Sequence, residues 1–352
     1  MAAKKKTNHI PYADIARILG AFSVVLLHTA GARLISVPIE SSEFLWAAFF
    51  DCVTRWSVPL FIMLSGMLFL NKHKKLNVKT LYTKNILHMV TAFIFWSYVF
   101  NFYSAFAQTR SIPSSLILAL KKLPQGAMHL WFIFVIVGLY IILPFAKRMC
   151  ENMTKKEAGW FIVLSAFVTF LPKTLSSFEI FAPFVSYITK FEINFALGYI
   201  GLFVAGWYIS YFEHSRRFKT VCYLMGIAGF LYMFVATVYF SRVRGIVADE
   251  FMSFKSLSAF LMAFAVFMLI KDVFEKKPFR RRTISNLAFY SKYTFGIYLI
   301  HEMFLNISAP KGWVVLADMP YIGIPVESVI IFLLSGIVVG IINALPLGKY
   351  IT

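Results

Sequence analysis

Pro11-Tyr-Ala-Asp14-Ile-Ala-Arg17-Ile-Leu-Gly20-Ala-Phe-Ser-Val-Val-Leu-Leu-His28-Thr-Ala-Gly31 is an unbroken, mostly apolar stretch near the N-terminus. It has the roughly 20 residues that a helix needs to cross a bilayer. Arg17 and His28 lie eleven positions apart within it. At 100° per residue that separation is about 20° past three full turns, so both side chains share one helix face, about 16 Å apart along the axis. Ionisable groups within a membrane are costly and usually functional, so the stretch predicts a membrane helix that carries a site.

The rest of the chain has the same apolar character. Of its 352 residues, 59% are hydrophobic and 14% are charged, and the mean hydropathy is +0.73, whereas soluble domains are about half apolar and a quarter charged. We therefore expect an all-α, polytopic integral membrane protein of about ten transmembrane helices, with residues 1–352 forming a single domain. The predicted spans are 11–31, 46–70, 86–107, 130–146, 159–172, 194–212, 219–240, 254–271, 290–309 and 326–346.

Two regions depart from this regular pattern. Pro172 cuts short the fifth predicted span, because a proline cannot continue the hydrogen bonding of a helix. The connections at 108–128 and 172–193 are long and contain aromatic residues and prolines. Each of them could re-enter the membrane or lie on its surface.

The basic residues that give the chain its formal charge of +19 are distributed as a signal of membrane topology. Nucleic-acid binding needs a basic face on a soluble fold, but here the basic residues lie in short loops between apolar runs, so no nucleic-acid partner is expected. With a cytoplasmic N-terminus, 23 of the 35 Lys and Arg residues fall on the inner side and ten on the outer side. By the positive-inside rule, this predicts that both termini are cytoplasmic. The cysteines (Cys52, Cys150 and Cys222) are too scattered for a disulfide framework or a metal site, and no metal is predicted.

The N-terminus also resembles a signal peptide. Lys4, Lys5 and Lys6 precede the apolar run, and Ala30-Gly31-Ala32 resembles a cleavage site. Asp14 and Arg17 lie within the run, however, where a signal core does not normally carry charge. We expect the segment to be retained as the first transmembrane helix.

The second predicted helix carries several groups of interest. Asp51 and Arg55 are four residues apart, so they can neutralise each other on one face. Pro59 frees a backbone carbonyl within the helix. Ser65-Gly66 permits close packing or the close approach of a ligand. The bland interpretation is that the ion pair, the proline and the glycine are structural devices.

Three of the seven histidines fall at one predicted depth. His28, His129 and His301, together with Arg55, all lie in the outer half of the membrane by this topology. A single membrane histidine is often only a hydrogen-bonded packing residue. Three of them beside an arginine are more than composition predicts, and Arg17 and His28 on one face are hard to explain by packing. These residues therefore predict a functional site.

With these residues the sequence resembles acyltransferase family 3 of membrane proteins. Its signature of an arginine and a histidine separated by ten residues is similar to Arg17 and His28. Three more motifs follow in the family's order along nearly the whole chain, although residues 150–290 match poorly. They are Arg55-Trp-Ser-Val-Pro59-Leu-Phe61-Ile-Met-Leu-Ser65-Gly66, His129-Leu-Trp131-Phe132 and Ser291-Lys-Tyr-Thr294-Phe-Gly-Ile-Tyr298-Leu-Ile-His301.

The resemblance implies a function and its partners. Members mostly move an acyl group, usually acetyl, from cytoplasmic acyl-coenzyme A to a hydroxyl of a cell-envelope sugar. It thus implies an O-acetyltransferase of the bacterial inner membrane, with acetyl-CoA as donor substrate and a glycan or lipid-linked sugar as acceptor. In form the chain resembles the short members without an attached hydrolase-like domain that acetylate enterobacterial common antigen. The acceptor, the acyl chain length and the existence of a homo-oligomer are left open.

The expected roles divide along the membrane normal. Arg17, Ser65 and the run Arg280-Arg281-Arg282 are expected to bind the donor, since guanidinium groups pair well with phosphates. His28 is expected to act as a general base or as a nucleophile, two routes that the sequence does not separate. Arg55, His129, Tyr298 and His301 complete the expected catalytic set.

Two other classes of function compete with this one. A transporter or flippase for a lipid-linked sugar or a small acid would also carry ionisable residues within the membrane. A membrane scaffold or sensor would need no aligned arginine and histidine.

Overall fold

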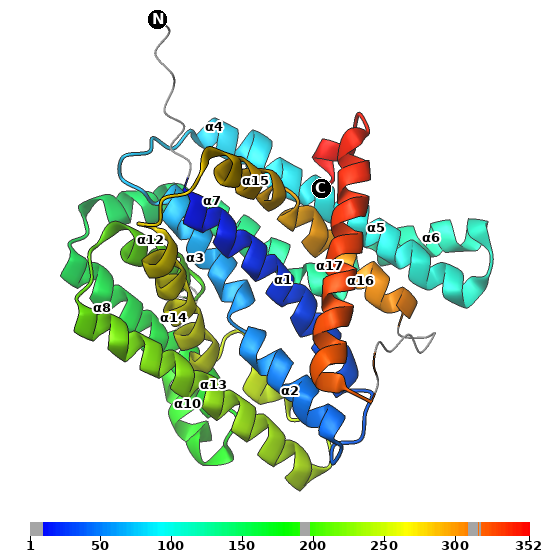
Figure 1. Ribbon diagram of the computed structural model, residues 1–352, viewed down its shortest axis with the longest axis horizontal. Coiled ribbons are helices and arrows are strands. Elements are labelled where there is room, and N and C mark those ends of the chain that lie inside the picture. The colour runs from blue at the N-terminus through cyan, green and yellow to red at the C-terminus, as the bar shows by residue number, and fades with distance from the viewer. Residues whose placement is uncertain (1–9, 191–197, 309–315, 317) are drawn as a thin grey trace, which may run out of the picture.

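The central element of the structure, a computed structural model, is α1 (Pro11–Leu34). The structure describes residues 10–190, 198–308, 316 and 318–352, and every regular element in these residues is a helix (Figure 1). Pro11 stands in the first turn of α1, where its missing N–H would have no partner in any case. Helices α2, α3, α14, α15, α16 and α17 all contact α1. Arg17 and His28 therefore lie on a helix that is surrounded by others.

The helices follow one another with short connections. Their bounds are α2 (Ser42–Thr54), α3 (Ser57–Phe69), α4 (Val78–Thr80), α5 (Leu87–Thr109), α6 (Ile112–Lys122), α7 (Trp131–Asn152), α8 (Lys155–Ser165), α9 (Leu171–Leu175), α10 (Ala182–Thr189), α12 (Ile200–Tyr211), α13 (Arg216–Arg244), α14 (Leu257–Phe274), α15 (Arg281–Ser291), α16 (Thr294–Ser308) and α17 (Pro320–Ala344). Polar side chains cap the N-termini of several helices. The hydroxyl groups of Ser41, Ser215 and Ser256 accept a backbone N–H in the first turns of α2, α13 and α14.

Eight helical segments of the described chain are long and apolar enough to cross a membrane, which confirms the all-α, polytopic prediction. Each of the ten predicted spans coincides with helix. The two that fall outside the eight are 194–212 and 290–309, whose residues 194–197 and 309 lie outside the described part. Their described helices, α12 and α16, have 12 and 15 residues. The count of ten and the cytoplasmic position of both termini stay predictions, and Lys4, Lys5 and Lys6 lie outside the described residues.

The second predicted span is two helices rather than one. Helix α2 ends at Thr54, and α3 begins at Ser57, only two residues before Pro59. The proline ring excludes the carbonyl of Arg55, four residues earlier, from a helical hydrogen bond. The sequence placed the disturbance at Pro59, but the break falls one turn earlier, at Arg55 and Trp56.

Pro172 does not end the fifth span. The helix continues from Lys155 to Leu175, with a π-helical turn at Ala166–Phe170 directly before α9. Because Pro172 stands in the first turn of α9, the wider turn before it absorbs the missing hydrogen bond. The long connection at 108–128 contains α6, which packs on α5 to form the hairpin at the right of Figure 1.

The closest helix crossing joins α3 to α12. A Cβ added to Gly66 would lie 1.7 Å from the carbonyl oxygen of Phe203, and one added to Gly206 would lie 1.8 Å from that of Met63. The two backbones therefore touch, and only glycine fits at either position. Small residues serve this purpose commonly in membrane helix packing. The crossing holds α3 in place. Ser65, the neighbour of Gly66, lies in the wall of the cavity described below.

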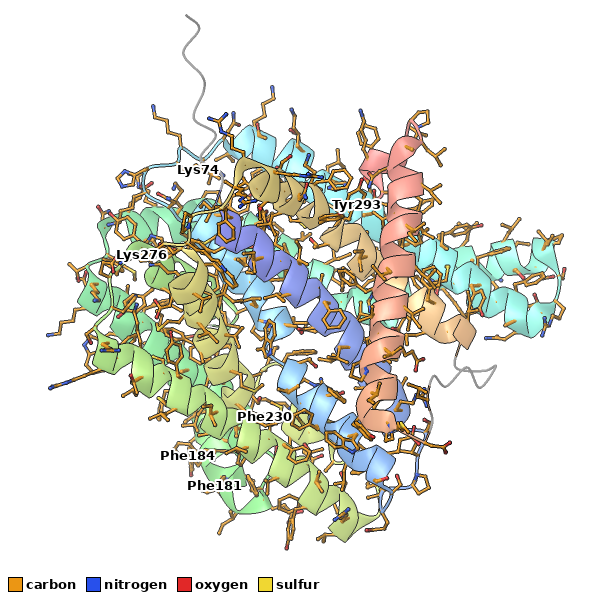
Figure 2. The ribbon with its side chains drawn as sticks, viewed as in Figure 1. Lys74, Phe181, Phe184, Phe230, Lys276 and Tyr293 are labelled. Carbon is orange, nitrogen blue, oxygen red and sulfur yellow. The ribbon has the colours of Figure 1, made fainter. Side chains whose placement is uncertain are left out.

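The ends of the molecule separate as the charge pattern predicts. Lys74 and Lys276 come from two predicted inner loops and lie toward the top of Figure 2. Phe181 and Phe184 come from a predicted outer connection and lie toward the bottom of the same view. These two predicted inner loops and this predicted outer connection thus lie toward opposite ends of the view in Figure 2.

Candidate active site

Three histidines from distant parts of the sequence meet in the interior. His28 lies on α1, His129 on a short 3₁₀ turn (Met128–Leu130) before α7, and His301 on α16. The ring centroid of His301 is 5.1 Å from that of His28 and 5.7 Å from that of His129. His301 is fully buried and His129 nearly so, while 29% of the His28 side chain is exposed. His28 is therefore the imidazole that a substrate can reach.

Glu302 lies beside these rings and was not among the predicted site residues. Its Oε2 atom is 3.6 Å from Nδ1 of His28 and 3.9 Å from Nε2 of His301. The signal that would have identified it was present, since a carboxylate within a predicted span is itself unusual. A base oriented by a carboxylate is a recurring arrangement in acyl-transfer sites.

Backbone carbonyls fix the protons of two of the three rings. Nδ1 of His301 is 2.8 Å from the carbonyl oxygen of Tyr298, and Nε2 of His129 is 3.3 Å from that of Leu299. A carbonyl only accepts, so each of these nitrogens carries a proton. No such bond to His28 occurs in the described residues, and its Nδ1 faces Glu302 instead. A proton on that nitrogen leaves Nε2 of His28 free to act as a base.

Arg55 occupies the break between α2 and α3. Its Nε donates to Oδ1 of Asp51 at 2.5 Å, which confirms that the two residues pair. Its guanidinium carbon lies 4.9 Å from the ring centroid of Phe254. In the described part of the chain only Nε is hydrogen-bonded. The terminal nitrogens of Arg55 therefore remain as donors toward a bound group.

Tyr298, a member of the expected catalytic set, lies against two of the histidines. Its hydroxyl donates to the backbone carbonyl of His129 at 2.6 Å, and its ring packs near both His129 and His301. The proton that would stabilise an oxyanion is thus already engaged. Tyr298 holds the turn that carries His129, and it also lines the cavity described next.

A cavity of about 1000 Å³ extends along α1 on the side of Arg17. Its wall contains Arg17, Ser65 and Tyr298 of the predicted site residues, on an otherwise largely apolar surface from α1, α3, α5, α7 and α16. Arg17 donates to Asp14 at 2.8 Å, and Asp14 accepts from the hydroxyl of Ser291 at 2.7 Å. Asp14 thereby orients the guanidinium that faces the cavity.

The cations of the cavity wall are partly unexpected. Lys84 and Lys349 line it together with Arg17, and no carboxylate of the described chain does so. The exposed Arg280, Arg281 and Arg282 lie at the start of α15 and are not part of the wall. The sequence could not distinguish these basic groups, because loops far apart in the chain contribute them.

The cavity ends short of the histidines. Its deepest residue on α1 is Val24, one turn before His28, and neither His28, His129, His301 nor Arg55 lines it. The rings of Phe61, Phe132 and Tyr298 stand at this end, with Phe132 packed against both of the others. These three rings, which we call the aromatic barrier, line the cavity, and Tyr298 also packs near His129 and His301.

The cluster also has the donor set of a metal site. Ligand atoms of His28, His301 and Glu302 all lie within 4.8 Å of one another. Two imidazoles and one carboxylate are a set that zinc accepts. The absence of a metal requirement, which the cysteine pattern suggested, therefore stays a prediction.

The fold and site together define a polytopic membrane protein with a buried imidazole–carboxylate pair at one end of a cation-lined cavity. The chain belongs to acyltransferase family 3, whose model, described as an acyltransferase domain, matches residues 10–347. It is thus a membrane acyltransferase. No significant match is found among curated proteins or among solved structures.

Proposed function

We propose that the chain is an O-acetyltransferase of the bacterial inner membrane. It transfers an acetyl group from cytoplasmic acetyl-CoA to a hydroxyl of a cell-surface or lipid-linked glycan. The observation that carries the proposal is the cavity, because it begins among cations at Arg17 and ends one turn from His28 on the same helix. Coenzyme A is long and rich in phosphate, and it is confined to the cytoplasm, whereas envelope glycans are displayed outside. A site that extends across the membrane answers both constraints.

The donor would enter with its phosphates at the cationic end. Arg17, Lys84 and Lys349 supply three positive charges without a competing carboxylate in the described wall. Charge-assisted hydrogen bonds to phosphate are among the strongest in proteins. The pantetheine arm would follow the apolar wall past Ser65 and Leu64 and bring the thioester to the aromatic barrier. A small rotation of these aromatic side chains would let the thioester reach His28.

In the chemical step His28 would react with the substrates, and Glu302 would orient the His28 imidazole. Nε2 of His28 takes the proton of the sugar hydroxyl while the hydroxyl oxygen attacks the thioester carbonyl carbon. The carbon–sulfur bond then breaks, and the departing thiolate of coenzyme A receives the proton from the imidazolium. In the nucleophilic route Nε2 attacks the thioester carbonyl carbon, and the carbon–sulfur bond breaks to release the thiolate of coenzyme A. The sugar hydroxyl oxygen then attacks the acetyl carbon of the acyl-imidazole, the carbon–nitrogen bond breaks, and the hydroxyl proton passes to the thiolate. In both routes the terminal nitrogens of Arg55 would stabilise the oxyanion.

The acceptor would approach from the outer end. Trp131 and Phe254 lie there with their ring centroids 5.7 Å apart, and Arg55 stacks on Phe254. Aromatic faces beside a donor-rich guanidinium suit a sugar ring, which has apolar faces and polar edges. Acceptor selection would therefore involve Phe254, from the region between α13 and α14, as well as the outer connections.

Transfer of labelled acetyl groups tests the proposal. Membranes that contain the wild-type chain and its glycan should move label from acetyl-CoA into the glycan. The His28→Ala variant should lose this activity by at least about 10³-fold at normal expression, and Arg17→Ala should raise the KM for acetyl-CoA. Full activity of His28→Ala would end the catalytic assignment. A transporter or flippase would instead move its substrate without consuming acetyl-CoA.

A further inference from the structure

A second, smaller cavity opens beside the cationic end of the large one. Its volume is about 230 Å³, and it shares Phe69 and Asn85 with the larger cavity. Sites for whole small molecules usually occupy about 300–1,000 Å³. The smaller cavity is therefore suited to one group of a ligand whose remainder lies in the larger one.

The groups around this cavity favour an anion. Lys74 and Lys75 line it, and no carboxylate of the described residues does. Asn77 also lines it, and because its Oδ1 already accepts the backbone N–H of Thr80 at 2.9 Å, its amide NH₂ remains as a donor. Two ammonium groups and an amide donor match the oxygens of a phosphate monoester, which carries close to two negative charges at neutral pH.

The inner loop Lys72-His73-Lys74-Lys75 divides its cations between two directions. Lys72 lies against Trp207, with its Nζ 5.7 Å from a ring centroid and 3.4 Å from the carbonyl oxygen of Met153. Lys74 lies 5.4 Å from the ring centroid of Phe69, which belongs to both cavities. Only part of this basic run is thus directed at the small cavity, which a general topology signal would not require.

We infer that the small cavity binds the 3′-phosphate of the coenzyme A donor, through Lys74 and Lys75. This inference rests on the proposed function, which places the phosphates of the same donor near Arg17, Lys84 and Lys349, and it assigns the pyrophosphate to that larger cationic end. Coenzyme A carries its one phosphate monoester on the ribose, apart from the pyrophosphate. A small anion site next to a larger cationic mouth fits that division.

Comparison of acetyl-CoA with acetyl-dephospho-CoA, which lacks only this phosphate, tests the inference. Apparent Kd values come from the thermal stabilisation of detergent-purified protein. The wild-type chain should bind acetyl-CoA about tenfold or more tightly than acetyl-dephospho-CoA. The double variant Lys74→Gln/Lys75→Gln should bind both donors equally, with an unchanged Kd for acetyl-dephospho-CoA. The Lys79→Gln variant, which changes an exposed lysine of the neighbouring α4 outside the cavity wall, should retain the wild-type preference.

Each other outcome overturns a distinct part of the account. Equal affinity of the wild-type chain for both donors would remove the 3′-phosphate from the small cavity and leave the proposed function intact. A preference that survives in the double variant would do the same for Lys74 and Lys75, and would leave the cavity to another phosphate such as that of a lipid headgroup. Binding of neither donor would overturn the proposed function itself.

Discussion

His28 differs from the other histidines of the site in what holds its ring. His129 and His301 are fixed by backbone carbonyls, whereas Nδ1 of His28 lies 3.6 Å from a carboxylate oxygen of Glu302. A carboxylate orients an imidazole and stabilises its protonated form, as in catalytic triads. Glu302 would thus act as a positioning residue for His28.

The Glu302→Gln variant tests this role. It keeps the size of the side chain but removes the charge, so kcat should fall by about 10²- to 10⁴-fold. The KM for acetyl-CoA should stay unchanged, because Glu302 is not part of the cavity wall. Glu43→Gln is a matched control, since Glu43 is 25% exposed against 26% for Glu302 and pairs with Arg33 instead. A kcat within threefold of the wild-type value would exclude the role of Glu302.

Sequence predicted the residues of this site unevenly. The shared face of Arg17 and His28 followed from helical geometry alone, because both residues lie on one rigid element. The meeting of His28, His129 and His301 followed from their common predicted depth. Lys84 and Lys349 could not be found in this way, because their place in the wall depends on how the π-helical turn Leu81–Ile86 packs on α5 and α7, and on how the C-terminal residues pack on α5 and α17.

At the scale of elements, the crossing of α3 and α12 governs the position of the cavity wall. Gly66 contacts the α12 backbone, and this contact directs its neighbour Ser65 into the cavity. The sequence left open whether Ser65-Gly66 serves packing or ligand approach. The structure shows that Gly66 serves packing, and that Ser65 faces the space where we place the donor.

Gly66→Ala should destabilise the protein. The added methyl would meet a backbone carbonyl that cannot move independently, and overpacking of this kind costs about 1–3 kcal/mol or more. Gly138→Ala on α7 is the control, because nothing lies within 4 Å of its Cβ position. That change should be neutral or stabilising by up to about 1 kcal/mol. Thermal unfolding of both variants in detergent provides the measurement, and an unchanged Tm for Gly66→Ala would contradict the close crossing.

The sequence predicted the presence of the helices better than it predicted where they are interrupted. Every predicted span is mainly helical in its described part, since spanning length and apolar composition leave few alternatives in a membrane. The interruption at Arg55 and the π-helical turn before Pro172 were not predicted in their observed form. Both depend on how the chain accommodates a proline, and neighbouring helices decide that as much as the proline does.

For the whole molecule, the central feature is a cavity that begins among cations and ends one helical turn short of His28. The charge pattern predicts that its cationic end is cytoplasmic, so we expect the donor phosphates and the chemical step at opposite ends of the molecule. Phe61, Phe132 and Tyr298, the aromatic barrier, line the cavity, whereas His28 does not. Donor binding and chemistry should therefore be separable by mutation.

The most direct test measures the thermal stability of purified wild-type, His28→Ala and Arg17→Ala protein with increasing acetyl-CoA. A ligand that binds only the folded state at 100 times its Kd stabilises it by about 2.7 kcal/mol. If the cavity binds the donor through Arg17, acetyl-CoA should raise the Tm of the wild-type and His28→Ala proteins equally. It should raise the Tm of the Arg17→Ala protein far less. No stabilisation of the wild-type protein, or equal stabilisation of Arg17→Ala, would contradict the account.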